Sequence, residues 1–193
     1  NSKATEEAFK AFSGKSPSVL HIATHGFFFE GVKKMTVSEF ANIDISKESV
    51  YKVSEDPLMR SGLILAGANY EWQHGHNPYA KENGILTASE ISNLDLSKTD
   101  MVVLSACNTG LGDIDGSEGV YGLQRAFKMA GVNIIVMSLW EVPDAETSEF
   151  MQLFYSNWLG GMKVREAFRD TQRNMSTKYK DTPEKWAAFV LFE

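Results

Sequence analysis

Two residues of this 193-residue sequence have the types and positions of a nucleophile and its base. Cys107 ends the apolar run that begins at residue 101, and His25 ends the run that begins at residue 19. A free thiol has a pKa of about 8.5, so little of it is thiolate at neutral pH. A neighbouring imidazole accepts its proton and later protonates a leaving amine. The pair predicts nucleophilic catalysis, although a buried cysteine is most often a small apolar side chain.

Gly26, directly after the histidine, adds a second chemical element. Because glycine has no side chain, its backbone N–H can approach a developing oxyanion closely. The N–H of Cys107 would stand beside it. These two N–H groups are therefore candidate oxyanion donors. His21, in the middle of the same apolar run, is expected to be an ordinary core or surface residue.

Five short apolar runs predict the strands that position these residues. Most runs are near-continuous, as in a sheet whose two faces are both covered by helices. Amphipathic stretches lie between them, and this alternation indicates an α/β fold with a mostly parallel sheet. Ligands bind such sheets at the carboxyl ends of the strands, where the two candidate residues would meet. The predicted strands are residues 19–25, 62–68, 101–107, 133–139 and 187–192, and the predicted helices are residues 4–12, 117–129, 145–159 and 163–175.

Two long segments, residues 27–60 and 70–83, fit neither period and predict functional loops or mobile insertions. Only one predicted helix precedes the first strand, whereas a doubly wound sheet has strands on both sides of its centre. We therefore expect one domain over residues 1–193 that lacks its first strands and carries an insertion around residues 27–60. Release of the chain from a longer precursor would account for such an organisation.

Composition excludes several classes of protein. One cysteine rules out an internal disulfide and a cysteine-rich zinc site, and it fits a reducing, cytoplasmic compartment. A net charge of −6 argues against a nucleic-acid-binding surface, and the apolar runs are too short to span a membrane. No metal or other cofactor is expected. Calcium binding by Asp113, Asp115 and Glu118 is a weaker alternative, because their run is too short for a full calcium loop.

Two motifs resemble those of a known family. The segment Leu20-His-Ile-Ala-Thr-His-Gly26 is similar to the His-Gly motif of CHAT domains, caspase-like modules often found after tetratricopeptide repeats. The segment Leu104-Ser-Ala-Cys-Asn-Thr-Gly110 is similar to their cysteine motif. Further matches follow in the family's order, so the resemblance runs from about residue 19 to the end of the chain.

This resemblance implies a caspase-like three-layer sandwich and a cysteine endopeptidase of the caspase, gingipain and separase group (clan CD). It implies that Cys107 attacks the peptide carbonyl, that His25 transfers protons and that a thioester forms. It also implies a protein or peptide substrate, an upstream repeat region or N-terminal piece as partner, and activation by that partner or by autoprocessing. The alternative is a catalytically silent scaffold, since some caspase-like domains keep the fold without the activity.

The resemblance says less about specificity. Related enzymes that cut after Arg or Lys often place an acidic residue two positions before the cysteine, where this sequence has Ser105. Acidic residues near other strand ends could substitute, although Asp144 is better explained as a helix cap. Trp140 is expected to line the cleft or to belong to the core, and the peptide is expected to add as a strand beside residues 138–140. The expected substrate contacts are Ser105, Ser138, Trp140, Glu141 and Asp144.

Overall fold

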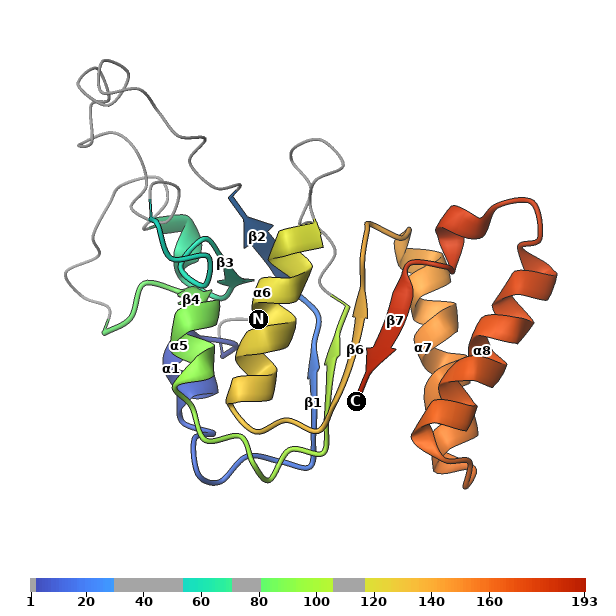
Figure 1. Cartoon of the computed structure of the whole chain (residues 1–193), viewed down its shortest axis with the longest axis horizontal. Coiled ribbons are helices and arrows are strands. Elements are labelled where there is room, and N and C mark those ends of the chain that lie inside the picture. Colours follow the sequence, from blue (N-terminus) through green and yellow to red (C-terminus); the bar gives the residue numbers. More distant parts are fainter. Residues whose placement is uncertain (1–2, 30–53, 71–80, 106–116) are drawn as a thin grey trace, which may run out of the picture.

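A four-stranded, mostly parallel sheet lies at the centre of the molecule (Figure 1). The computed structural model describes residues 3–29, 54–70, 81–105 and 117–193. Strand β5 (Met101–Leu104) pairs in parallel with β1 (Val19–Ile22) and β6 (Ile134–Ser138), and β7 (Phe189–Phe192) joins β6 antiparallel. The predicted α/β fold with a mostly parallel sheet is confirmed. Cys107 and most of the predicted insertion around residues 27–60 lie outside the described residues.

A second, antiparallel sheet contains β2 (His25–Phe28), β3 (Ser61–Ile64) and β4 (Ile85–Thr87). The prediction of one strand over residues 19–25 is therefore wrong. The chain leaves the parallel sheet after Ile22 and begins β2 at His25. The predicted irregular segment also begins too early, because Phe27 is buried against Ala68 and Ile85 in a small core of its own. Burial of this ring keeps β2 ordered beyond the first strand.

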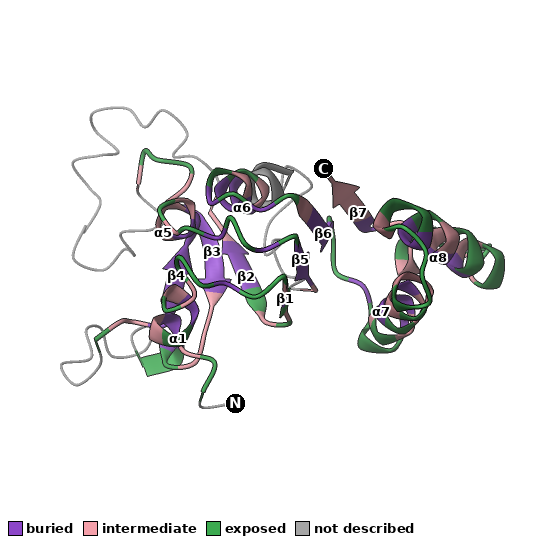
Figure 2. Ribbon diagram, turned by 90° about the horizontal axis from the view of Figure 1, so that it is seen from below, coloured by how far each residue is buried: buried purple, intermediate pink, exposed green. Residues whose placement is uncertain are grey.

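Helices cover both faces of the parallel sheet, which gives three layers (Figures 1 and 2). Alternate residues of β5 point to opposite faces. Val102 and Leu104 belong to the core shared with the first group of helices, and Met101 and Val103 to the core shared with the second. The first group is α1 (Glu6–Lys10), α5 (Ala88–Ser92) and α6 (Ser117–Met129); the second is α7 (Asp144–Leu159) and α8 (Val164–Lys178), followed by a short 3-10 helix, η1 (Pro183–Lys185).

Local sequence sets several helix boundaries. Thr87 and Glu90 form a capping box that starts α5, a helix not predicted from the sequence. Gly161, with φ of +104°, lies in the turn between α7 and α8, where a side chain would strain the backbone. Within the described part of the chain, no helix has both the length and the apolar character needed to cross a membrane.

Strand β1 is an outer strand of the parallel sheet. The carbonyl oxygens of Ser18 and Ile22 accept hydrogen bonds from β5 and the residues flanking it. Because main-chain groups alternate along a strand, those of Val19 and His21 point away from β5. No strand among the described residues pairs with that edge. If the first strands of the domain are missing, β1 must have such an open edge. Their absence itself stays a prediction.

Candidate active site

His25 stands at the start of β2, where the chain passes from the parallel sheet to the antiparallel one. Thr24, the residue before it, donates a hydrogen bond from Oγ1 to the carbonyl oxygen of Ile64. His25 itself lies opposite Ile64 in the β2–β3 pair. These contacts fix the backbone at His25 and leave the residue exposed.

Gly26 is buried in β2, opposite Leu63. Hydrogen-bonded and non-hydrogen-bonded pairs alternate along an antiparallel ladder. The N–H of Phe29 donates to the carbonyl oxygen of Arg60 at 2.8 Å, so the pair at Gly26, three positions away, belongs to the non-hydrogen-bonded class. The N–H of Gly26 therefore points away from β3, and no hydrogen bond from it is found among the described residues.

Ser105 marks the point where β5 ends beside β1. Its N–H donates to the carbonyl oxygen of Ile22 at 3.1 Å, which adds one more bond between the two strands. Cys107 follows two residues later, outside the described part of the chain. The position of Ser105 thus locates the end of the strand that leads to the cysteine.

A cavity of about 920 Å³ opens at the carboxyl ends of β1 and β5. Its walls come from β1 and the residues that follow it, from the residue after β5, and from α7 with the segment that precedes it. Four residues predicted from the sequence line it together: His25, Ser105, Glu141 and Asp144. The cavity is large enough to receive part of a peptide.

Ser138 and Trp140 are not among the described residues that line this cavity. Ser138 is buried in β6 and pairs with Phe189 of β7. Trp140 is partly exposed, and its indole N–H donates to the carbonyl oxygen of Glu184 at 2.9 Å. The prediction that a peptide strand adds beside residues 138–140 is wrong, because β7 already occupies that edge of β6.

Asp144 is the first residue of α7 rather than its cap. Pro143 holds the cap position, and no side chain there makes a capping hydrogen bond. The predicted capping role of Asp144 is therefore wrong. Its carboxylate instead lies in the first turn, where the positive end of the helix dipole favours it, and it contributes a negative charge to the cavity.

His21 also lines this cavity, although the sequence predicted no role for it. Its Nδ1 lies 3.0 Å from the hydroxyl of Tyr155, and its Nε2 lies 3.3 Å from the hydroxyl of Ser105. Desolvation lowers the pKa of His21 and raises the pKa of Tyr155. Tyr155 is 134 residues away along the chain, so no local pattern could have identified this contact.

Comparison with known proteins establishes the family. The CHAT domain family matches residues 1–193. This chain belongs to the CHAT domain family. The family is related to caspase-like peptidases, in agreement with the three-layer fold. Tetratricopeptide repeat protein 28 of Mus musculus and that of Homo sapiens are each 34% identical to the chain over 108 residues. The match covers 55% of this chain and 4% of the length of each relative.

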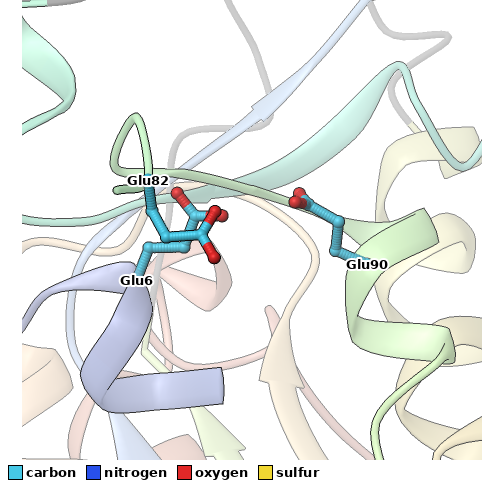
Figure 3. Close-up of side chains that lie close together, drawn as sticks. All are labelled: Glu6, Glu82 and Glu90. Atoms are coloured by element: carbon cyan, nitrogen blue, oxygen red, sulfur yellow. The ribbon is translucent and has the colours of Figure 1, made fainter. Parts of the chain in front are cut away.

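A group of three carboxylates in the CHAT domain has the composition of a metal site. Ligand atoms of Glu6, Glu82 and Glu90 lie within 4.8 Å of one another (Figure 3). The ammonium group of Lys10, however, contacts all three at 2.6 to 2.8 Å. It already supplies the positive charge that a metal ion would bring. We therefore interpret the group as an ion-pair cluster that links α1 to α5 and to the segment before β4. Of the acidic residues proposed for calcium, Asp113 and Asp115 lie outside the described residues.

Replacing Lys10 by methionine is expected to destabilise the CHAT domain in a pH-dependent way. Burial raises the pKa of Glu6 to about 7. Ionisation of Glu6 therefore lowers the free energy of unfolding, an effect that is absent below about pH 4.5 and complete above pH 7. Without the ammonium group that pKa rises further, and the three carboxylates repel one another. We expect a loss of about 2–3 kcal/mol at pH 8, reduced because two carboxylates are partly exposed, and a loss below about 1 kcal/mol at pH 5.

Urea unfolding at the two pH values measures this difference. Lys15→Met, at an exposed position near the end of α1, is the matched control and should change stability little at either pH. An equal loss at pH 5 and pH 8 for Lys10→Met would show that the ammonium group does not act through these carboxylates.

Proposed function

We propose that this CHAT domain is a cysteine endopeptidase in which Cys107 and His25 form the catalytic dyad. The observation that carries the proposal is the shared cavity. His25 and Ser105 both line it, although they come from different sheets, and Cys107 follows Ser105 by only two residues. If the thiol of Cys107 reaches this cavity, His25 lies in the same cavity and can act as its base, as a catalytic dyad requires.

The proposed reaction begins when the thiolate of Cys107 attacks the scissile carbonyl carbon. The negative charge that develops on the carbonyl oxygen is stabilised by the N–H groups of Gly26 and Cys107. His25 protonates the leaving amine, the C–N bond breaks and a thioester remains on Cys107. Water then attacks the thioester while His25 accepts a proton, which releases the acid and restores the thiol. The orientation of the Gly26 N–H, away from β3, supports its part in this scheme.

The proposed substrate is a peptide segment of a protein that enters the cavity beside α7. Ser105, Glu141 and Asp144 line this cavity and are proposed to contact the substrate. Ser138 and Trp140 remain proposed contacts only for parts of a peptide that extend beyond the described lining. Strand addition to β6 does not belong to the proposal, because β7 already pairs with β6.

A repeat region upstream is the proposed regulatory partner. The curated relatives carry tetratricopeptide repeats in their name, and the match occupies only a small part of their length. Such repeats bind other proteins through extended concave surfaces. We propose that a partner captured there, or processing of the precursor, brings the CHAT domain into its active form. Cytoplasmic location and autoprocessing belong to the same proposal.

Covalent labelling tests the dyad without knowledge of the substrate. An epoxide inhibitor that alkylates thiolates should label the chain once, at Cys107, and intact-mass analysis followed by peptide mapping identifies the site. His25→Ala should slow labelling by about tenfold or more at pH 7, because the thiolate loses its partner. Equal labelling rates for the two proteins would favour the alternative, a scaffold whose cysteine has no catalytic partner.

A further inference from the structure

Three side chains from three different elements form one hydrogen-bonded chain in the cavity wall. His21 of β1 bridges the hydroxyl of Tyr155, on α7, and the hydroxyl of Ser105, after β5. The ring of Tyr155 stacks on the imidazole at 5.7 Å between centroids, with 26° between the ring planes. Stacking and two hydrogen bonds hold the imidazole in one orientation. The proposed dyad does not use any of these three groups.

The number of hydrogens on His21, Tyr155 and Ser105 determines which hydrogen bonds these side chains can make with a ligand. Neutral His21 carries one N–H, and the two hydroxyls carry one hydrogen each. Two of these three hydrogens form the hydrogen bonds among the three side chains. The third remains on one of the two hydroxyls and can be donated to a ligand. The oxygens of Ser105 and Tyr155 also keep lone pairs. While His21 is neutral, both hydroxyl oxygens can therefore accept hydrogen bonds from a ligand, and the three side chains together carry no positive charge.

Apart from the proposed base His25, the charged residues described in the cavity wall are acidic. Glu141 and Asp144 line it, and among its described lining residues there is neither a lysine nor an arginine. A carboxylate ligand would meet two carboxylates, whereas a cation would find two counter-charges and two hydroxyl oxygens. Met151 and Val142 supply apolar surface in the same wall, which suits the aliphatic stem of a long basic side chain.

We propose that this cavity receives an arginine or lysine side chain of the substrate and that His21 is the residue that determines this specificity. The proposal rests on the proposed peptidase function and names its substrate class. While His21 is neutral, it orients the two hydroxyls as acceptors for the basic group. Protonated His21 donates to both hydroxyls and places a positive charge beside the basic group, so preference for that group falls.

The charged and titratable groups around His21 determine where this change occurs. Tyr155 and Ser105 contact the ring directly, Glu141, Asp144 and His25 share its cavity, and Lys3 lines a second cavity on which His21 also borders. Burial lowers the pKa of His21, so the imidazole is mostly neutral at pH 8 and gains protons below its ordinary range. The preference for a basic side chain over an uncharged one should therefore weaken as the pH falls below about 6.5.

A pair of peptides measures the preference. One carries arginine before the cut and the other norleucine, which has a similar stem and no charge. We expect the ratio of their kcat/KM values to be about ten at pH 8 and to be measurably smaller at pH 5.5. Effects of pH on the catalytic step itself act on both peptides alike and cancel in the ratio. A peptide with glutamate that is cut faster than the norleucine peptide would overturn the proposal.

Variants of two residues locate the effect. His21→Gln keeps one donor and one acceptor but does not titrate, so its ratio should stay constant between pH 5.5 and 8. Lys3→Met, outside this cavity, should keep the pH dependence of the original chain. The same pH dependence in His21→Gln as in the original chain would show that His21 does not determine the specificity.

A binding measurement separates failure of this proposal from failure of the peptidase proposal. In Cys107→Ala, N-acetyl-argininamide should lower the pKa of the His21 imidazole followed by NMR, and N-acetyl-norleucinamide should not. If no peptide is cut in a Cys107-dependent way but argininamide still lowers this pKa, the peptidase function fails and the basic-side-chain site stands. If argininamide leaves the pKa unchanged, the specificity proposal fails whatever the cleavage result.

Discussion

Peptide hydrolysis by Cys107→Ala is expected to fall by about 10⁴-fold or more in kcat/KM, because the variant cannot form the thioester. The residual rate would come from binding and from the oxyanion donors alone. Hydrolysis of a fluorogenic peptide selected from a library with the original chain provides the measurement. Thermal unfolding provides the control, since replacing one thiol group by a hydrogen atom should leave the fold intact.

The double variant gives a sharper test of the dyad. If His25 acts only by activating Cys107, then His25→Ala combined with Cys107→Ala should be no slower than Cys107→Ala alone. If the two residues contributed independently, the rate reduction in the double variant would be the product of the two single reductions. Hydrolysis that persists at the original rate in Cys107→Ala would remove the peptidase proposal and leave the scaffold role.

Replacing Gly62 by alanine is expected to have the largest effect on stability. A Cβ atom there would lie 2.4 Å from the carbonyl oxygen of Leu86 and 2.7 Å from the ring of Phe27. Overpacking of this kind costs about 3 kcal/mol, which lowers the melting temperature of a domain this size by about 5–10 °C. The ring of Phe27 must move, and His25 lies two residues before it on the same strand, so activity should fall as well.

Gly67→Ala is the matched control for this substitution. Gly67 has φ of +108°, but a Cβ atom there meets nothing within 4 Å. Its cost should be limited to backbone strain of about 1–2 kcal/mol, with activity unchanged after correction for the folded fraction. Calorimetry compares the two variants. A smaller loss for Gly62→Ala than for Gly67→Ala would contradict the close packing of β3 against β2 and β4.

Much of the fold could be predicted from the sequence because long elements leave a clear periodic signal. The predicted helix at residues 117–129 has the same bounds as α6, and the predicted strands at residues 101–107 and 133–139 contain β5 and β6. Two short elements, β4 and α5, were not predicted. Strand β4 has three residues and α5 has five, so neither contains enough turns or alternations to show a period.

The division of residues 19–25 into two strands could not be predicted for a different reason. An apolar run shows burial, but it does not show which sheet supplies the hydrogen-bond partners. Those partners are Met101 to Leu104 for β1 and Ser61 to Ile64 for β2, both distant in sequence. The contact of His21 with Tyr155 has the same origin. Sequence motifs therefore predicted the proposed chemistry more completely than the cavity in which it is placed.

The break between β1 and β2 has a mechanical consequence. In the described part of the chain no ladder joins the two sheets, so His25 and the strand leading to Cys107 belong to separately hydrogen-bonded bodies. The alignment of base and nucleophile then depends on side-chain packing and on the two-residue connection at Ala23 and Thr24, which are softer than a shared ladder. A molecule that touches only the antiparallel sheet could therefore change the rate of the proposed reaction without entering the cavity.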